Sequence, residues 1–311
     1  MFRVIGILII ICFFFYLYGA TKEVDVYVFV TTWGSEGNGK REFKYPEGIA
    51  VDSSFYVYIT DTGNHRVQKF DSTGKFVTAW PVYGAKKGEA SSPSGITLDE
   101  EGNIYIVDRW NHRIEKYDRK GNLITKEKLE GFGNTQAYTL YGPVGLALSE
   151  GGFIYIADPF NHIIQEFDTS CKFVSQWDLR AHEETVLFGA LGISVDGKGY
   201  IYVTDISNHC IRKFDWEANF IEKFGKKGEG NGQFYYPTGI SIDKKGYIYI
   251  SDFNQRIQKF NSRGKFITTW GIKGSGNGEF EYPEGIALDP NENVYVVDRW
   301  NHRVQKFSPE K

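Results

Sequence analysis

Residues 282–307, which read YPEGIALDPNENVYVVDRWNHRVQKF, contain the two short motifs that decide the fold of this chain. The first motif, YPEGIALD, recurs in six related forms, and its glycine stands at positions 48, 95, 145, 192, 239 and 285. The second motif, DRWNHRVQKF, opens thirteen residues after each glycine, with Asp61, Asp108, Asp158, Asp205, Asp252 and Asp298. Repeats of 46 to 50 residues are typical of propellers and solenoids.

Each repeat predicts four short β-strands and no helix. Runs such as GIAVD (48–52), RVQKF (66–70) and KFVTAW (75–80) are rich in Val, Ile and Phe and have a hydrophobic period close to two. Turn signals such as STGK (72–75) and RKGN (119–122) separate them. Four antiparallel strands in about 47 residues predict one propeller blade, so the fold class is all-β, a six-bladed β-propeller.

The two ends of the chain predict how the ring closes. The sixth repeat stops after its third strand, whereas residues 26–48 match residues 265–285, which contain a fourth strand. We therefore expect residues near 26–34 to complete the blade that begins near residue 283. Closure of this kind leaves no large unpaired sheet edge.

The motif D-x-x-N-H-R-[VI]-Q-K-F, with P-x-G-I-A-[VL]-D before it, resembles the NHL repeat. The resemblance covers residues 24–311 in six copies, and it implies a six-bladed propeller. It says less about function, because one fold hosts several activities.

The polar residues of the second motif are expected to build the turns between strands. The aspartate can accept backbone N–H groups, the asparagine is expected in the left-handed conformation, and the histidine in a hydrogen bond within the turn or between blades. A zinc site is excluded because the histidines of different blades lie at the start of the third strand, well out from the axis, and so cannot meet at one ion. The predicted structural residues are Asp61, Asn64, His65, Asp108, Asn111, His112, Asp158, Asn161, His162, Asp205, Asn208, His209, Asp252, Asp298, Asn301 and His302.

Charge and cysteine content exclude several classes of function. The 311 residues include 36 basic and 39 acidic side chains, a net charge of −3. This balance argues against a dedicated nucleic-acid-binding protein, so no nucleic acid is expected as a partner. The three cysteines, at positions 12, 171 and 210, form no CxxC pair, which excludes zinc fingers and thioredoxin-like redox sites.

The N-terminus predicts export. Residues 4–18 are an uninterrupted apolar run behind Arg3, within the length range of a signal peptide. We expect residues 1–22 to be a signal peptide or an N-terminal membrane anchor and residues 23–311 to be the propeller. The protein would then be exported, at the cell surface, membrane-anchored or secreted. We expect it to be a monomer, in contact with the membrane only if the segment is uncleaved.

One candidate site is the propeller face that carries the loops between the second and third strands. Positions that vary there between repeats include Arg beside Trp, a composition typical of binding hot spots. A protein, peptide or glycan is the expected ligand, although the tryptophans can also simply fill grooves between blades. The expected contacts are Arg109, Trp110, Phe160, Phe253, Arg299 and Trp300.

The second candidate site is the mouth of the axial channel. The residue before each repeat glycine should lie there: Glu47, Ser94, Val144, Leu191, Thr238 and Glu284. Glu47 and Glu284 fall in neighbouring blades once the ring closes, so they can converge on a calcium ion, although Ca²⁺ needs six to eight oxygen ligands. Carboxylates that are solvated or paired with lysine are the alternative.

From these features the sequence predicts a non-catalytic binding scaffold, and therefore not an enzyme, with no cofactor unless calcium binds. The first alternative is a calcium-dependent, lactonase-like propeller hydrolase, and the second is the RNA-binding role of some NHL proteins. The resemblance also implies a third possible activity, that of a zinc-dependent amidating lyase, which can be compared with the residues of this chain. The amidating lyase of similar fold binds zinc through histidines before the repeat glycine, and none of the six residues here is histidine.

Overall fold

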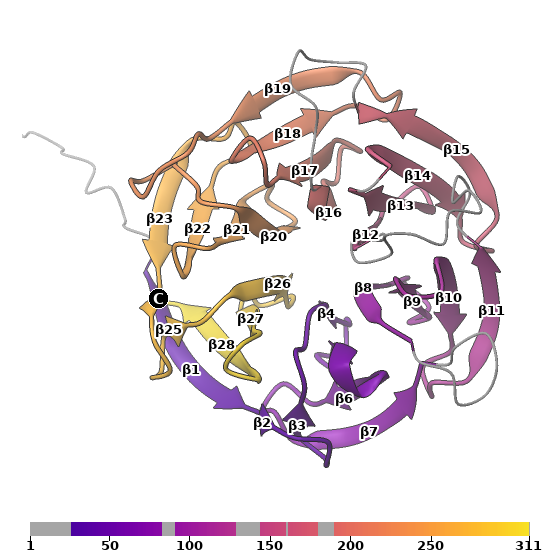
Figure 1. The fold of residues 1–311 in the computed structure, drawn as a ribbon. Helices are drawn as coiled ribbons and strands as arrows, with labels where there is room; N and C mark the ends of the chain where they lie inside the picture. The colour runs from indigo at the N-terminus through magenta and orange to yellow at the C-terminus, as the bar shows by residue number, and fades with distance from the viewer. Residues whose placement is uncertain (1–25, 83–90, 129–143, 160, 180–189, 311) are drawn as a thin grey trace, which may run out of the picture.

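The computed structural model describes residues 26–82, 91–128, 144–159, 161–179 and 190–310, which form a closed ring of six four-stranded antiparallel sheets (Figure 1). Phe160 and the predicted leader 1–22 lie outside the described residues. Within those residues, no helix has the length and apolar character needed to cross a membrane. Export and membrane attachment therefore stay predictions.

Blades 1 to 5 each take their four strands from one repeat, and every blade has its first strand at the axis and its fourth at the rim (Figure 1). Blade 1 holds β4 (Ile49–Val51), β5 (Val57–Asp61), β6 (Arg66–Phe70) and β7 (Phe76–Pro81); blade 2 holds β8 (Pro93–Leu98), β9 (Ile104–Asp108), β10 (Arg113–Tyr117) and β11 (Leu123–Lys128); blade 3 holds β12 (Gly145–Leu148), β13 (Phe153–Asp158), β14 (Ile163–Asp168) and β15 (Phe173–Asp178); blade 4 holds β16 (Ala190–Val195), β17 (Ile201–Asp205), β18 (Cys210–Phe214) and β19 (Phe220–Phe224); blade 5 holds β20 (Pro237–Ile242), β21 (Ile248–Asp252), β22 (Arg256–Phe260) and β23 (Phe266–Trp270); blade 6 holds β26 (Pro283–Leu288), β27 (Val294–Asp298), β28 (Arg303–Pro309) and β1 (Tyr27–Trp33).

Blade 6 confirms the predicted closure. Strand β1, from the start of the chain, pairs antiparallel with β28, from its end, in a register that runs from Tyr27 opposite Pro309 to Trp33 opposite Val304. Short additional pairs form in the loops that enter blades 1 and 6: β2 (Ser35–Glu36) with β3 (Glu42–Phe43), and β24 (Ile272–Lys273) with β25 (Glu279–Phe280). Hydrogen bonds between the two chain ends thus seal the ring.

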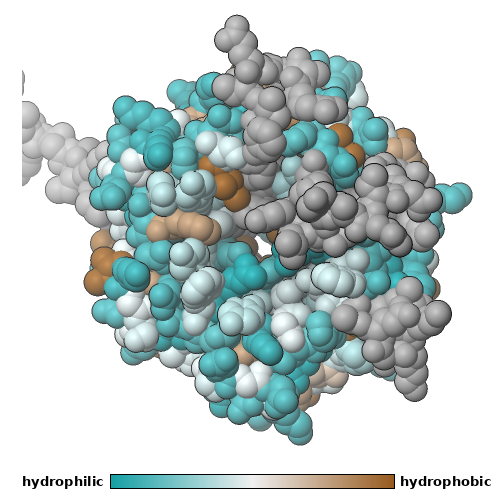
Figure 2. All heavy atoms as spheres, in the orientation of Figure 1, coloured by the Kyte–Doolittle hydropathy of each residue, from teal (hydrophilic) through white to brown (hydrophobic). Residues whose placement is uncertain are grey.

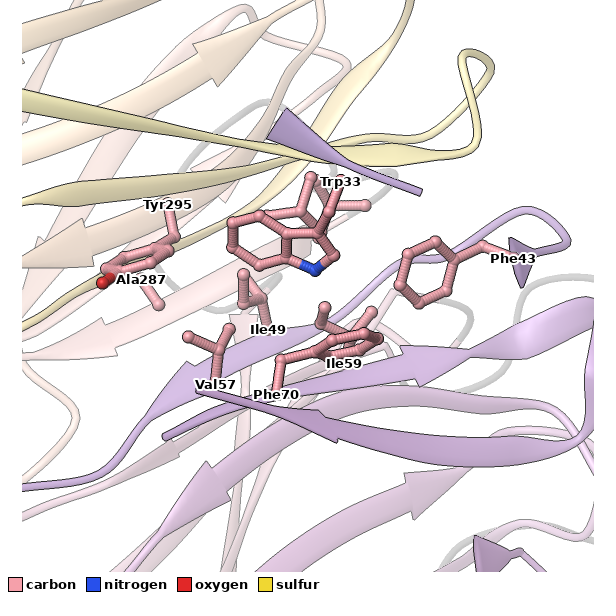
Figure 3. Close-up of a cluster of buried hydrophobic side chains, with 10 residues drawn as sticks. Trp33, Phe43, Ile49, Val57, Ile59, Phe70, Ala287 and Tyr295 are labelled. Atoms are coloured by element: carbon pink, nitrogen blue, oxygen red, sulfur yellow. The ribbon is translucent and has the colours of Figure 1, made fainter. Parts of the chain in front are cut away.

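The hydrophobic core is divided among the interfaces between adjacent blades. Between blades 6 and 1, Trp33 packs with Phe43, Phe70 and Tyr295 (Figure 3). The Trp33 ring also lies over Gly74, whose φ of +81° is left-handed, and a Cβ there would come within 2.7 Å of the indole. Glycine in the STGK turn therefore serves two purposes, the turn conformation and the close approach of the neighbouring blade.

The second motif ties two loops together on one face of the ring. In blade 1, the Asp61 carboxylate accepts hydrogen bonds from the Lys44 backbone N–H at 2.7 Å, from Asn64 Nδ2 at 2.9 Å and from Arg66 Nε at 2.7 Å. The short 3₁₀ turn η1 (Thr62–Asn64) lies between these partners. The aspartate thus joins the loop that enters the first strand to the loop between the second and third strands.

The histidines, and not the asparagines, adopt the left-handed conformation. His65, His112, His162, His209 and His302 have φ between 50° and 57°, and in blade 5 Gln255 has φ of 63°. The prediction that the asparagines hold this conformation is wrong, because each Asn side chain instead donates to the motif aspartate, as Asn64 does to Asp61. His302 Nδ1 accepts the Tyr45 N–H at 3.2 Å, and Gln255 Oε1 accepts the Tyr282 N–H at 2.6 Å. These bonds run from one blade to the loop that enters the next.

Candidate functional site

The axial channel is narrow because the repeat glycines let the inner strands approach closely. A Cβ on Gly239 would lie 1.9 Å from the Glu284 carbonyl oxygen, and one on Gly285 would lie 2.4 Å from that of Glu47. The cavity inside the ring measures about 310 Å³ and is lined by the inner strands of all six blades. It opens near the centre of the face shown in Figure 2. Of the residues before the repeat glycines, five line the channel: Glu47, Ser94, Val144, Thr238 and Glu284.

Two arginines turn toward the two carboxylates. Arg109 Nη2 and Arg299 Nη2 each lie 2.9 Å from Glu47 Oε1, and Arg299 Nη1 lies 2.7 Å from Glu284 Oε1. Arg109 follows the motif aspartate of blade 2, and Arg299 follows that of blade 6, so the two arginines reach the blade 1 carboxylate from opposite sides. The network therefore spans three consecutive blades.

The network leaves hydrogen-bonding capacity unused. Glu47 is only 5% exposed and Glu284 18%. Among the described residues, Glu47 Oε2, Glu284 Oε2 and Arg299 Nε have no hydrogen-bond partner. Buried polar atoms in this state are costly and uncommon, so they point to a functional role or to a group that binds there.

The Glu284 carboxyl has an unusual affinity for its proton. Burial raises its pKa from 4.5 to about 7; the Arg299 charge opposes the rise, and the charge of Glu47 adds to it. An acid group that titrates near neutral pH can both donate and accept a proton under physiological conditions. Such a group in a cavity is a candidate for catalysis.

An aromatic pocket of about 420 Å³ adjoins the network. Its walls are Tyr45, Phe253, Tyr282 and Trp300, and it shares Glu284 and Arg299 with the network. The Trp300 ring stacks on Tyr282 at 4.6 Å and 24°, and Phe253 meets Tyr282 edge to face at 4.7 Å. Trp300 nevertheless stays 52% exposed, so part of its surface is available to a ligand.

The two candidate sites of the sequence analysis thus share residues. Arg299, Trp300 and Phe253, predicted on the loop face, meet Glu284, predicted at the channel mouth, in one pocket. Arg109 contacts Glu47, whereas Trp110 is 55% exposed and does not line this pocket.

Sequence reasoning missed Tyr45 and Tyr282. The signal was present, because both tyrosines stand directly before the proline of the first motif in repeats 1 and 6. The four aromatic walls are therefore supplied by three repeats, blades 1, 5 and 6.

The described residues do not fit a calcium ion at Glu47 and Glu284. Calcium needs six to eight oxygen ligands, but the Oε1 atoms of both carboxylates already accept hydrogen bonds from guanidinium groups. Two fixed positive charges at this distance also repel a cation. Within the described part of the chain, no cluster of three or more His, Cys, Asp or Glu residues could hold a metal ion. The predicted calcium site therefore gains no support.

The two cysteines of the described residues do not line this site. Cys171 and Cys210 are both buried, form no disulfide and lie outside the pocket and the channel. Burial raises the pKa of the Cys171 thiol to about 12, so it stays protonated and unreactive at neutral pH.

Family models confirm the repeat. Residues 43–70, 91–117 and 280–307 match the NHL repeat, and residues 183–261 match a model described as a 6-bladed beta-propeller. No curated protein matches the chain.

Solved structures of the same fold include enzymes. A catalytically inactive variant of virginiamycin B lyase from Staphylococcus aureus, solved with quinupristin, is 14% identical, with 90% of this chain and 99% of that chain covered and a TM-score of 0.63. A gluconolactonase from Xanthomonas campestris is 14% identical, with 87% and 88% covered and a TM-score of 0.64. A protein of unknown function from Bacteroides thetaiotaomicron is 19% identical, with 91% and 76% covered and a TM-score of 0.69.

These structures overturn the prediction that the chain is not an enzyme. At such low identity the likeness establishes the fold alone, but two of the three proteins are enzymes. The prediction rested in part on the lack of histidines before the repeat glycines. That reasoning was wrong, because a fold that supports catalysis can carry its reactive groups at other positions.

Proposed function

We propose that this six-bladed propeller, built from NHL repeats, is an enzyme that hydrolyses an ester or lactone in the pocket beside Glu284. The observation that carries the proposal is the position and the raised pKa of the Glu284 carboxyl. It lines both the channel and the aromatic pocket, its pKa is raised to about 7, and it is ion-paired with Arg299 at 2.7 Å. A pocket with aromatic walls, a few convergent polar groups and a perturbed acid is where an active site is expected.

The network assigns a role to each charged group. In its ionised form, Glu284 takes a proton from a water molecule as the water oxygen bonds to the substrate carbonyl carbon. Negative charge develops on the carbonyl oxygen, and the Arg299 guanidinium stabilises it. When the carbon–oxygen bond breaks, Glu284 returns the proton to the departing oxygen, so the products are an acid and an alcohol.

Glu47 acts as a positioning residue in this scheme. Because Glu47 Oε1 is ion-paired with both Arg299 Nη2 and Arg109 Nη2, it fixes the guanidinium of Arg299 against Glu284. Support for the reaction class comes from the fold shared with a gluconolactonase, an enzyme named for a lactone.

The test is a screen of the full-length chain against a panel of esters and lactones in a pH-stat, which records the acid released. With an active substrate, kcat/KM should rise with pH through about 7 and then level off, because Glu284 must lose its proton first. Glu284→Gln should lower kcat/KM by about 10² or more.

Glu292→Gln is the matched control. Glu292 lies in the turn between β26 and β27 and pairs with Lys245, outside the pocket. Its substitution should leave the rate unchanged. A rate that is equal in Glu284→Gln and in the wild-type chain, or that shows no change with pH near 7, would falsify the proposed role of Glu284.

A further inference from the structure

We propose that the substrate bound in this pocket carries an uncharged pyranose ring, which stacks on Trp300 and donates hydroxyl hydrogen bonds to the Glu284 carboxylate. The inference names the substrate class and rests on the proposed function of the same site.

The aromatic residues form a platform and not a cage. Tyr282 is enclosed, since Trp300 stacks against it and Phe253 meets it edge to face. Tyr45 packs against His302 at 5.0 Å. The two rings with the most free surface are Trp300, which is 52% exposed, and Tyr45, which is 42% exposed. A flat apolar ring surface suits the apolar C–H face of a sugar ring, whereas a quaternary ammonium group needs aromatic faces on several sides.

The polar groups beside the platform match hydroxyl groups. Glu284 and Arg299 line the pocket, and their side chains are 18% and 26% exposed, so a carboxylate acceptor and a guanidinium donor face a ligand there. A hydroxyl group both donates and accepts, so neighbouring hydroxyls on one ring can bond to the carboxylate and the guanidinium group together. A purely aromatic ligand would displace water from these two groups without replacing its hydrogen bonds, which costs free energy.

The charge balance of the site favours a neutral ligand. Arg109 and Arg299 offset Glu47 and Glu284 when both carboxyl groups are ionised, so the four charges sum to zero. In the pocket itself Arg299 pairs with Glu284, so a cationic ligand would meet the guanidinium group and an anionic ligand would meet the carboxylate. Above pH 7, neither a cationic nor an anionic ligand gains a net electrostatic attraction in the pocket. An uncharged polyol is repelled by neither group.

The volume of the pocket sets the size of the bound part. About 420 Å³ lies within the range of small-molecule pockets and holds one ring with its substituents. The remainder of a larger substrate would extend from the open face. We therefore assign one sugar ring to the Trp300 platform.

The experiment measures binding apart from turnover. The full-length chain, kept in a detergent without a sugar headgroup, is titrated calorimetrically with methyl glucoside, methyl galactoside and methyl mannoside. Indole, glucosamine and glucuronate serve as aromatic, cationic and anionic probes. At least one methyl glycoside should bind, and Trp300→Ala should weaken its binding by about tenfold or more, equal to about 1.4 kcal/mol. Trp300→Phe should restore part of the affinity.

Trp216→Ala is the control for loss of an exposed tryptophan. Trp216 is 65% exposed and lies between β18 and β19, away from the pocket, so its substitution should leave the affinity unchanged. Equal binding by Trp300→Ala and the wild-type chain overturns the proposal, as does binding of indole or of a charged probe in place of every glycoside.

Glu284→Gln separates the two proposals, because it should still bind the glycoside although its turnover is lost. Glycoside binding without any Glu284-dependent turnover would contradict the enzyme and leave the sugar site. Turnover of an ester with no sugar binding would contradict the sugar site and leave the enzyme.

Discussion

The two sides of the channel mouth have the same backbone but differ in their side chains, which are charged on one side and uncharged on the other. Where blades 6, 1 and 2 meet, the positions before the glycine and after the aspartate carry Glu284, Glu47, Arg299 and Arg109 in one ion-pair network. On the far side, the equivalent positions in blades 3 and 5 carry Val144, Pro159 and Thr238, and Thr238 Oγ1 donates to the Pro283 carbonyl oxygen at 2.9 Å. The repeat therefore supplies six equivalent positions, and charged residues at a few of them create one charged side.

The largest expected effect is on the charged side. Glu47→Gln removes the carboxylate that pairs with both Arg109 and Arg299, and leaves two guanidinium groups with a neutral partner. Because Glu47 is 5% exposed, the free energy of unfolding should fall by about 4 kcal/mol, as for other broken buried ion pairs. Urea denaturation at pH 8 measures it. A change below about 1 kcal/mol would show that the pairs contribute no more than surface ones.

The second effect is the pH dependence of stability. The pKa of Glu284 is about 7 in the folded chain and near 4.5 when unfolded, so the folded state binds the proton more tightly. This stabilisation is fully present below pH 4.5 and is lost as pH rises to about 7.

The stability of the wild-type chain relative to Glu284→Gln should therefore fall by up to about 3 kcal/mol between pH 4.5 and pH 8. Thermal unfolding of both proteins across this range measures the difference. A difference that stays constant with pH would contradict the raised pKa of Glu284.

Arg109→Met should have an intermediate effect. It removes one of the two guanidinium groups on Glu47, so the free energy of unfolding should fall by about 2 kcal/mol, typical of a hydrogen bond to a charged group. The Arg109 charge also lowers the pKa of Glu284, so the pH profiles of stability and of turnover should both move upward. Unchanged profiles would show that the Arg109 charge has no effect on the pKa of Glu284.

The smallest effect belongs to the uncharged side. Thr238→Val keeps the shape of the residue but removes a hydroxyl that contacts the Pro283 carbonyl oxygen and Ser251 Oγ, both at 2.9 Å. The free energy of unfolding should fall by about 1 kcal/mol, with no change in the pH profile. Thermal unfolding of Thr238→Val and of Glu47→Gln, which change the same position of two different repeats, measures the difference between the two sides. An effect as large as that of Glu47→Gln would remove the distinction between the two sides.

Much of the site was predictable residue by residue, but its assembly was not. Glu47 and Glu284 were placed at the channel mouth from their position before the repeat glycine. Arg299 and Trp300 were placed on the loop face from their position after the motif aspartate. That these positions meet was missed, because the reach of an arginine side chain across a blade boundary depends on the distance between blades. The exchange of roles between Asn and His in the turn was missed for a similar reason, since each turn residue is held by partners in the neighbouring loop.

By itself, the sequence determined the all-β class, the six blades and the closure by β1, because each depends on patterns repeated along the chain. Strand periodicity and turn glycines act over a few residues, so they can be read locally. The tertiary structure alone decided which charges neutralise each other and which aromatic surface stays open. Burial, ion pairing and pKa depend on distances between residues far apart in the chain. Glu47 and Arg299, for example, are brought within 2.9 Å only when the ring closes.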